Sequence, residues 1–245
     1  HGERVQERRY PPRMRAVIFD MDGVLVDSER MHEAAIRAAC TEVGGPDSPH
    51  PLPDWQLYVG LGDKDAFAKV YADANRAHEF GHALRDELME AKKRHTTRMI
   101  ASGESWGAQV GAAELVRAAS TRGLTAVCSG SRAFEVLAML DGMRVLRLMR
   151  EVVTADICVR TKPDPLPYLL AAEKLGVAPR ECVVIEDTAI GVRAAKGAGM
   201  ACMAVEHTSP REKLLAAGAD ATIAKIRDLR VERLEELWER ALSAR

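Results

Sequence analysis

The sequence predicts an α/β fold, in which a Rossmann-like parallel sheet core carries an inserted all-helical cap domain. Two observations lead to this prediction. Short apolar runs recur along the chain, and each one ends in polar residues and is followed by a helical pattern. Between the first run and the second, residues 28–105 lack this rhythm and show helical patterns only. The chain has 245 residues, which is enough for a core and a smaller insert.

The apolar runs have the character of buried parallel strands, because they are continuous and do not alternate with polar residues. They cover residues 16–19, 124–128, 152–153, 182–185 and 201–205. The polar residues that end them are Asp20, Ser129, Thr154, Glu186 and Glu206. Ligands bind at the carboxyl ends of the strands in open parallel sheets, so we expect these polar side chains to converge on one site.

Helical patterns follow the strands at residues 112–121, 169–175 and 188–196, and each stops before a glycine. Inside the insert, a helix capped by Asp27 or Ser28 should run to Gly44 and Gly45, and further helices are expected at 63–74 and 83–101. The predicted parts are a disordered lead-in at 1–13, a catalytic core at 14–27 and 106–245, and a cap at 28–105.

Composition narrows the classes of function. The chain has 35 Lys and Arg residues and 36 Asp and Glu residues, so it has no large positive net charge that would attract nucleic acid or an anionic membrane. Its five cysteines include no C-x-x-C pair, which favours free thiols in a reducing cytosol over disulfides or a cysteine zinc site. No apolar run approaches membrane-spanning length. We therefore expect a cytoplasmic protein, monomeric or weakly dimeric, that acts on a small molecule.

Two pairs of acidic residues follow predicted strands. Asp20 and Asp22 come after the first strand, whereas Glu186 and Asp187 end a later one. Such carboxylates suit metal-assisted phosphoryl transfer, in which one is the nucleophile, one is the acid or base, and others hold a hard cation such as Mg²⁺. Each pair alone also fits a solvated turn or an N-cap, so the prediction depends on their occurring together.

Two further segments could bind an anion. Ser129-Gly130-Ser131 offers hydroxyl and backbone N–H groups at a predicted helix start. Lys162, which precedes Pro163, could neutralise phosphoryl oxygens. Taken singly, these segments are also compatible with a helix cap and a surface lysine. The order of all four segments and their placement at strand ends favour phosphoryl transfer.

These segments resemble the four motifs of the haloacid-dehalogenase-like superfamily. Residues 17–28 are similar to the first motif and Ser129 to the second. Lys162-Pro163 resembles the third, and Ile185-Glu186-Asp187 with Gly191 the fourth. The resemblance implies a magnesium-dependent enzyme with a Rossmann-like core and a helical cap between the first two motifs.

The resemblance also implies a role for each residue. Asp20 would attack phosphorus and form an aspartyl-phosphate, and Asp22 would protonate the leaving oxygen and then activate water or a second hydroxyl. Asp22 should keep a proton near neutral pH, because only its backbone carbonyl would contact the metal. Mg²⁺ would be held by Asp20, the Asp22 carbonyl and Asp187, with Glu186 as a ligand or an outer partner. The residues that would bind the transferring phosphoryl group are Ser129, Gly130 and Lys162.

The subgroup most resembled contains β-phosphoglucomutase and small sugar-phosphate phosphatases. Ser131 and Arg132 lie where mutases hold a second phosphate, and His32 lies where they carry a histidine near the hinge. The cap loop at 60–65 should face the substrate, and it lacks the arginine expected of a mutase. We therefore expect a phosphatase acting on a small phosphorylated metabolite, with sugar phosphates foremost. Phosphomutase activity is the alternative.

Two positions depart from the family pattern. Val110-Gly111 stands where the family usually has Pro-Gly before the helix that leads to the second motif. Leu166 stands four residues after Lys162, where the family usually has Asp. We expect these departures to affect the neighbouring helix starts and not the chemistry.

A rival prediction from another class comes from His78-Glu79-Phe80-Gly81-His82, which fits the H-E-x-x-H helix motif of zinc peptidases. A metzincin would need Gly and His where Arg85 and Leu88 stand, and Gly81 weakens the helix that must carry both histidines. Dehalogenase and phosphonatase chemistry are disfavoured because those branches generally lack an aspartate at the position of Asp22. Four intact motifs argue against a binding protein without activity.

Overall fold

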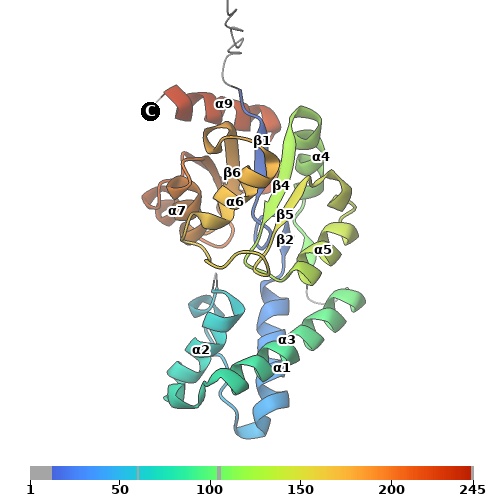
Figure 1. Ribbon diagram of the computed structural model, residues 1–245, viewed down its shortest axis with the longest axis vertical. Coiled ribbons are helices and arrows are strands. Elements are labelled where there is room, and N and C mark those ends of the chain that lie inside the picture. Colours follow the sequence, from blue (N-terminus) through green and yellow to red (C-terminus); the bar gives the residue numbers. More distant parts are fainter. Residues whose placement is uncertain (1–12, 60, 104–105, 244–245) are drawn as a thin grey trace, which may run out of the picture.

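A six-stranded parallel sheet forms the centre of the protein, in a computed structural model that describes residues 13–59, 61–103 and 106–243 (Figure 1). The strand order is β5-β4-β1-β6-β7-β8. The strands are β1 (Ala16–Phe19), β4 (Leu124–Cys128), β5 (Glu151–Val153), β6 (Cys182–Glu186), β7 (Ala201–Val205) and β8 (Ala221–Ile223). The predicted fold class is thereby confirmed. Strand β8 is not among the predicted strands, because Thr222 interrupts its sequence and leaves no continuous apolar run.

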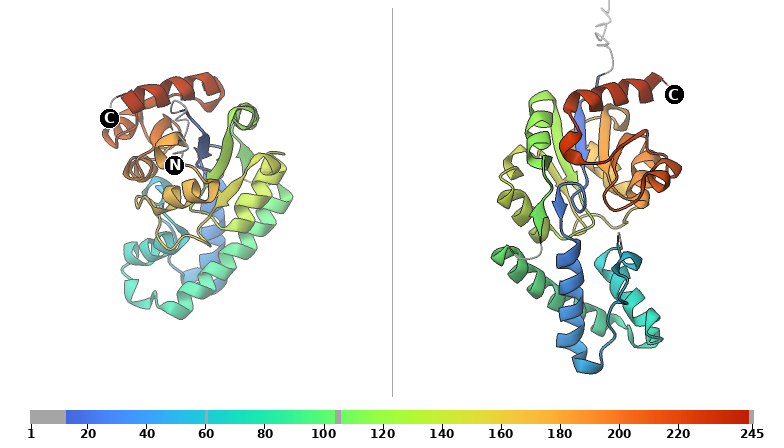
Figure 2. Two further views of the ribbon diagram at one scale, coloured as in Figure 1. Left: turned by 45° about the horizontal axis from the view of Figure 1, so that its top comes forward. Right: turned by 180° about the vertical axis from the view of Figure 1, so that it is seen from behind.

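Helices cover both faces of the sheet (Figure 2). Successive strand residues point to opposite faces, so in β1 Val17 and Phe19 join one apolar core and Ala16 and Ile18 join the other. The helices over the first core are α4 (Ala112–Arg122), α5 (Ala133–Gly142) and α9 (Val231–Ser243). Those over the second are α6 (Leu166–Leu175), α7 (Ala189–Gly197) and α8 (Arg211–Ala216). Both faces are buried, which explains why the strands are apolar throughout.

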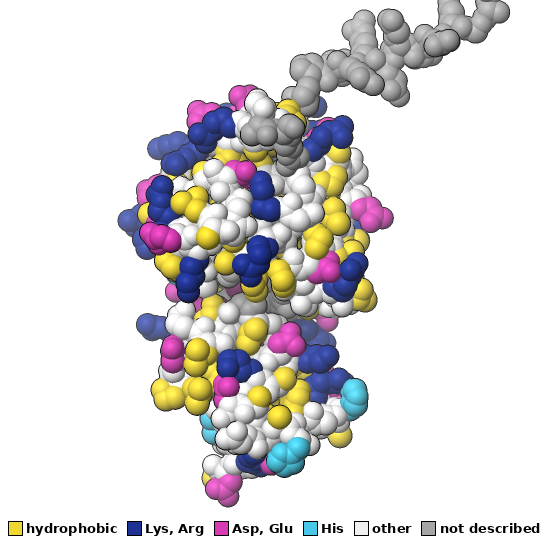
Figure 3. Space-filling view, turned by 90° about the vertical axis from the view of Figure 1, so that its left-hand side faces the viewer, with side chains coloured by type: hydrophobic (Ala, Val, Ile, Leu, Met, Phe, Trp, Pro, Cys, Tyr) yellow, Lys and Arg dark blue, Asp and Glu magenta, His cyan; other side chains and the backbone are white. Residues whose placement is uncertain are grey.

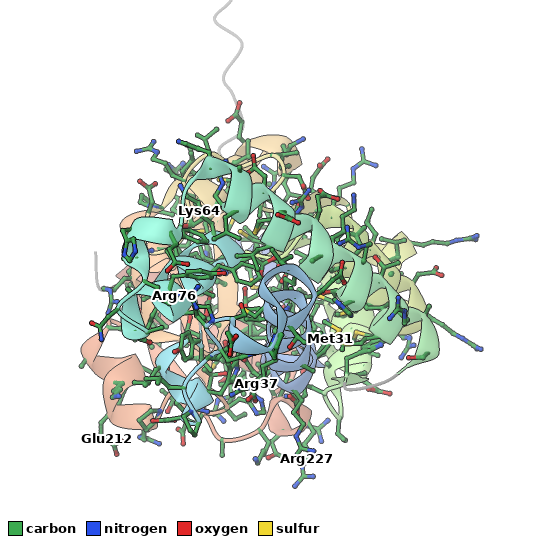
Figure 4. All side chains as sticks on the ribbon, turned by 90° about the horizontal axis from the view of Figure 1, so that it is seen from below. Met31, Arg37, Lys64, Arg76, Glu212 and Arg227 are labelled. Carbon is green, nitrogen blue, oxygen red and sulfur yellow. The ribbon has the colours of Figure 1, made fainter. Side chains whose placement is uncertain are left out.

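A helical cap lies below the carboxyl ends of β1, β4 and β6 and is nearest the viewer in Figure 4. Its helices are α1 (Glu29–Gly44), α2 (Asp63–Asp73) and α3 (His82–Ser102). The cap has its own apolar core, in which Ile36, Phe67 and Leu88 are buried. The narrowing between cap and core is visible in Figure 3. On the face shown there, Lys and Arg side chains are interspersed with Asp and Glu.

The chain crosses between the two parts along a short antiparallel ribbon. Strand β2 (Val26–Asp27) leaves the core and pairs with β3 (Gly107–Ala108), which returns to it. Gln109 N–H then donates a hydrogen bond to the Leu25 carbonyl at 2.9 Å, so the two crossings are joined side by side. The predicted cap boundaries at 28 and 105 fall next to this ribbon, and the division into domains remains our proposal.

The helix starts correct one detail of the sequence analysis. Ser28 occupies the N-cap position of α1, but its side chain makes no capping hydrogen bond. The hydroxyl donates to Asp22 instead, so the expectation of a side-chain cap from this residue is wrong.

At the two positions that depart from the family pattern, both helices form. Gly111, with φ of +87°, precedes α4, and the Asp164 carboxylate accepts a hydrogen bond from Leu166 N–H at 2.8 Å where α6 begins.

Three other predictions concern the chain as a whole. The disordered lead-in lies outside the described residues, except for Arg13. All five cysteines fall within the described part, and each is free. In that same part, the search for a helix long and apolar enough to cross a membrane finds none. The cytoplasmic location and the monomeric or weakly dimeric state stay predictions.

Candidate active site

The carboxyl ends of the central strands bring the predicted polar residues together. Asp20 N–H donates to the Ile185 carbonyl at 2.9 Å, which fixes the end of β1 beside the end of β6. On the other side, Ser129 N–H donates to the Val153 carbonyl of β5 at 2.9 Å. Asp20, Ser129 and Asp187 are all buried and follow neighbouring strands. The parallel sheet therefore supplies the convergence that the sequence led us to expect.

Lys162 is the cation at the centre of the site. Its ammonium lies 2.5 Å from Asp20 Oδ1 and 2.7 Å from Glu186 Oε1, and it also donates to the Cys128 carbonyl at 3.1 Å. Burial acts to lower the pKa of Lys162, but the charges of Asp20 and Glu186 outweigh it and raise that pKa well above its ordinary value. The lysine is therefore a fixed positive charge beside the candidate nucleophile.

Glu186 is fully engaged by protein donors. Oε1 accepts from Lys162 and from the Tyr168 hydroxyl at 2.8 Å. Oε2 accepts from the backbone N–H of Asp187 and from the N–H and hydroxyl of Thr188, at 3.0–3.1 Å. A Cβ on Gly191 would come within 1.7 Å of Oε1, so this helix position must be glycine for the carboxylate to fit. These contacts favour Glu186 as the group that orients Lys162, which is the outer role left open by the sequence.

Asp187 has the opposite environment. It is fully buried, and neither of its carboxylate oxygens has a hydrogen-bond partner within the described chain. Burial raises its pKa well above the ordinary value, the charges of Asp20 and Glu186 add to the rise, and the nearby Thr208 side chain opposes it. A Cβ on Gly23 would lie 1.9 Å from Asp187 Oδ2, so the close approach of these two segments also requires glycine. An unpaired buried carboxylate is costly unless a cation neutralises it.

A metal ion fits this arrangement. Asp20, Glu186 and Asp187 each place a carboxylate oxygen within 4.8 Å of the others. Lys162 alone cannot balance three buried carboxylates, and burial raises the pKa of Asp20 to about 8 despite that lysine. An all-oxygen donor set suits a hard divalent cation such as Mg²⁺ or Ca²⁺. Asp20 and Asp187 are the carboxylates of this set that remain available to hold it, because Glu186 is already engaged by protein donors.

The Asp22 side chain accepts four hydrogen bonds. Oδ1 accepts from the Ser28 hydroxyl and from His32 Nε2 at 3.2 Å. Oδ2 accepts from the hydroxyls of Ser129 and Ser131, at 3.2 and 2.8 Å. Burial acts to raise the pKa of Asp22, but the hydrogen bonds from His32, Ser28 and Ser131 bring it below its ordinary range. The expectation that Asp22 keeps a proton is wrong for this arrangement, because every contact favours the carboxylate.

His32 links this aspartate to the cap. Its Nδ1 lies 3.3 Å from the Lys92 ammonium, which can only donate, so Nε2 carries the hydrogen that is given to Asp22. Lys92 is almost completely buried and also pairs with Asp63 of α2 at 2.7 Å and with Glu135 of α5 at 3.3 Å. A chain of contacts therefore runs from the catalytic edge of the sheet through α1 and α3 to the first residue of α2.

Ser131 and Arg132 differ in what they can offer a substrate. The Ser131 hydroxyl donates a hydrogen bond to Asp22, and both Ser131 and Gly130 line a cavity between the strand ends and the cap. The Arg132 guanidinium lies 2.9 Å from Asp156 Oδ1, and the residue lines an adjoining hollow and not that cavity. Its pairing with Asp156 leaves Arg132 less available for a second phosphate than the sequence suggested.

Several residues in contact with the site were missed by sequence reasoning. They are Lys92, Glu135, Tyr168 and Thr188. Only Thr188 lies next to a motif and could have been found there. The other three lie on helices α3, α5 and α6, and nothing in their local sequence distinguishes them from structural residues.

The cavity lies between the cap and the strand ends, and we call it the chamber. Its volume is about 420 Å³, and it is lined by Asp20, Asp22, Ser129, Lys162 and Glu186 on the core side. On the cap side, Leu61, Gly62, Asp63 and Asp65 of the predicted substrate loop line it, whereas Gly60 is outside the described residues. A space of this size holds a small metabolite.

The zinc-peptidase motif does not form a metal-binding helix. His78 lies in a 3₁₀ turn (Ala77–Glu79), Gly81 is extended with ψ of 179°, and α3 begins only at His82. The two histidines therefore do not occupy successive turns of one helix. Glu79 is paired with Arg76 at 2.6 Å, and 78% of the His78 side chain is exposed. This geometry excludes the zincin arrangement in the described structure.

Comparisons with known proteins agree with this geometry. A family model described as haloacid dehalogenase-like hydrolase matches residues 14–199. The chain is 27% identical to the beta-phosphoglucomutase of Bacillus subtilis, over 92% of this chain and 96% of that protein. It is 32% identical to the phosphorylated carbohydrates phosphatase of Thermotoga maritima, over 86% and 94% of the two chains. A solved beta-phosphoglucomutase from Clostridium difficile aligns with a TM-score of 0.81 over 94% and 99% of the two chains, and its 21% identity supports the fold alone.

Proposed function

The chain belongs to the haloacid dehalogenase-like hydrolases, as a phosphatase or phosphomutase, and on this premise we propose that it hydrolyses a small phosphorylated metabolite. Sugar phosphates are the first candidates, because the similar proteins named above act on phosphorylated carbohydrates or carry the name of a sugar phosphomutase. The proposed reaction runs through an aspartyl-phosphate on Asp20 and depends on Mg²⁺.

The proposed metal ion would be held by Asp20, Asp187 and the Asp22 carbonyl. When bound, it supplies positive charge that reduces the repulsion between an anionic nucleophile and an anionic phosphoryl group. Lys162 supplies the second positive charge from a fixed position 2.5 Å from Asp20. Glu186 and Tyr168 hold Lys162 there, so the lysine faces the transferring group without rearrangement.

In the first half of the proposed reaction, an Asp20 carboxylate oxygen forms a bond to phosphorus and the bond from phosphorus to the alcohol oxygen breaks. That oxygen takes a proton from Asp22. Since four donors hold Asp22 as a carboxylate in this structure, it must take up this proton from solvent as the substrate binds, and give up some of those hydrogen bonds.

In the second half, a water oxygen bonds to phosphorus and the Asp20–phosphorus bond breaks, which regenerates the Asp20 carboxylate. The water gives one proton to Asp22, which is already an ionised acceptor fixed by His32 and three serines. The arrangement described here therefore favours the base step, and Ser129 and Lys162 would position the phosphoryl group for it.

The observation that carries the proposal is the buried Asp187 carboxylate, which lies beside the Asp20–Lys162 pair and whose oxygens accept no hydrogen bond from the residues that the structure describes. The test is hydrolysis of an aryl phosphate by the intact protein with Mg²⁺, with EDTA, and with Zn²⁺ after EDTA. We expect turnover only with Mg²⁺ or a similar hard cation, and none for Asp20→Asn. Peptide cleavage that needs Zn²⁺ and disappears in His78→Ala would refute the proposal.

A phosphomutase is the second candidate, favoured by Ser131 at the chamber and by the similarity to a beta-phosphoglucomutase. It requires that the aspartyl-phosphate be attacked by a sugar hydroxyl and not by water. Incubating a sugar monophosphate with a bisphosphate primer distinguishes the two: isomerised sugar phosphate indicates a mutase, whereas free sugar and inorganic phosphate indicate the proposed hydrolysis.

A further inference from the structure

The cap side of the chamber combines apolar and acidic side chains. Its apolar residues are Ile36, Trp55, Tyr58, Leu61 and Ala66, and its acidic residues are Glu29, Asp63 and Asp65. Among the described residues, the cap contributes no Lys or Arg to this lining, and His32 is its one side chain that can become a cation. The part of the substrate that leaves with the alcohol oxygen would meet this surface.

Trp55 is a preorganised aromatic surface. Its indole N–H donates to Glu29 Oε2 at 2.8 Å, and its ring stacks on Tyr58 with 5.4 Å between the centroids. Tyr58 is fixed in turn, because its hydroxyl donates to Asp73 Oδ2 at 2.7 Å and accepts from Leu52 N–H at 3.0 Å. A rigid ring of this kind can pack against the C–H face of a sugar or polyol without loss of side-chain freedom on binding.

Glu29 also lines the chamber, and one of its carboxylate oxygens is available as a hydrogen-bond acceptor. Only its Oε2 has a hydrogen-bond partner in the part of the chain that the structure describes, and that partner is Trp55. Burial raises the pKa of Glu29, while the Trp55 hydrogen bond lowers it. A ligand hydroxyl or ammonium could donate to the free oxygen, whereas a ligand anion would bring a second negative charge next to it.

The cations near the chamber are already paired or lie outside it. Asp63 occupies the substrate loop and binds Lys92, which it shares with Glu135. Arg160, at the core side of the chamber, lies 3.1 Å from Asp164. Lys64, labelled in Figure 4, lines the adjoining hollow and not the chamber. A second anionic group within the chamber would thus meet unneutralised acids and no unpaired cap cation among the described residues.

We propose that Glu29 and Trp55 are specificity-determining residues, which select phosphomonoesters whose other part is a neutral polyhydroxy group or carries an amine. The chamber discriminates against substrates with a second phosphate or a carboxylate. This inference rests on the proposed phosphatase function and deepens it, because exclusion of a bisphosphate also disfavours the mutase reaction, which needs one.

The test compares four hexose phosphates as inhibitors of aryl phosphate hydrolysis, which reports binding whether or not each one is turned over. They are glucose 6-phosphate, glucosamine 6-phosphate, 6-phosphogluconate and glucose 1,6-bisphosphate. In the wild type, the neutral and amine-bearing sugars should bind about tenfold more tightly than the two with an added anion. In Glu29→Gln, which keeps an acceptor for Trp55 and loses the charge, this ratio should shrink to about threefold or less.

Glu33→Gln is the matched control. Glu33 lies one turn along the same helix, pairs with Arg37 at the surface and does not line the chamber, so the ratio should keep its wild-type value. Three outcomes would overturn this inference and leave the proposed function standing. They are equal binding of all four compounds to the wild type, no binding of any of them, and an unchanged ratio in Glu29→Gln. Absence of Asp20-dependent aryl phosphate hydrolysis would instead overturn the proposed function.

Discussion

Removing the metal should make the fold sensitive to pH, because buried carboxylates at the ends of β1 and β6 then lack a counter-charge. Burial raises the pKa of Asp20 from 3.8 to about 8, with the charges of Glu186 and Asp22 adding to the rise and Lys162 opposing it. Between these two values the folded protein holds a proton that the unfolded chain has released. The free energy of unfolding must therefore fall as the pH rises through this window.

The expected size of the Asp20 contribution follows from the same pKa. Each pH unit within the window lowers the free energy of unfolding by about 1.4 kcal/mol, so the step from pH 5 to pH 7 costs about 3 kcal/mol. For a chain of this length, that corresponds to a fall in Tm of about 5–10 °C. Asp187, whose pKa burial also raises, adds to this fall. The Asp20→Asn variant removes this ionisation, so its Tm in EDTA should change less over the same step.

The assay is thermal unfolding followed by circular dichroism, in EDTA and in Mg²⁺, at both pH values. Mg²⁺ should restore the wild-type Tm at pH 7 and have a smaller effect at pH 5, where protonated carboxyls compete with the ion. Asp187→Asn should lose most of this stabilisation by Mg²⁺. The reasoning would be refuted if Tm changed with pH in parallel for the wild type and Asp20→Asn in EDTA. It would also be refuted if Mg²⁺ left the wild-type Tm unchanged at pH 7.

Three further predictions concern the parts around the nucleophile. Gly191→Ala should cost about 1–3 kcal/mol of unfolding free energy and lower kcat, because its Cβ would lie 1.7 Å from Glu186 Oε1. Gly197→Ala, on the same helix and without such a clash, is the control in urea unfolding and kinetics, and equal effects of the two would contradict the account. Lys92→Met should cost about 3–5 kcal/mol by leaving the buried Glu135 carboxylate unpaired, and a loss under about 1 kcal/mol in the same unfolding assay would count against a buried ion pair. Hydrolysis of an aryl phosphate should stop in EDTA and return with Mg²⁺. Full activity in EDTA would contradict the proposed dependence on a metal ion.

The sequence predicts the catalytic edge of the sheet well, because local signals and topology agree there. Each apolar run is a buried strand, and a parallel sheet brings the ends of its strands to one edge. Asp20, Lys162, Glu186 and Asp187 therefore meet as expected, although they are far apart in the chain.

What the sequence does not predict depends on contacts between elements. The donors around Asp22 come from two separate segments, the start of α1 and the residues after β4, so its ionisation follows from tertiary packing and not from its own motif alone. The same holds for Lys92, which looks like any lysine of an amphipathic helix and is nearly inaccessible in the structure. Arg132 is a second example, since its pairing with Asp156, 24 residues along the chain, has no local signature.

The most direct test of the central claim is to trap the phosphorylated protein. Rapid mixing with an aryl phosphate and Mg²⁺, acid quench, and peptide mass spectrometry should locate one phosphoryl group on Asp20. Asp20→Asn should carry none. Asp22→Asn should become phosphorylated, since an aryl leaving group needs little protonation, and then lose the group about 10²–10⁴-fold more slowly than the wild type. A phosphoryl group on another residue, or phosphorylation of Asp20→Asn at the wild-type rate, would contradict the account.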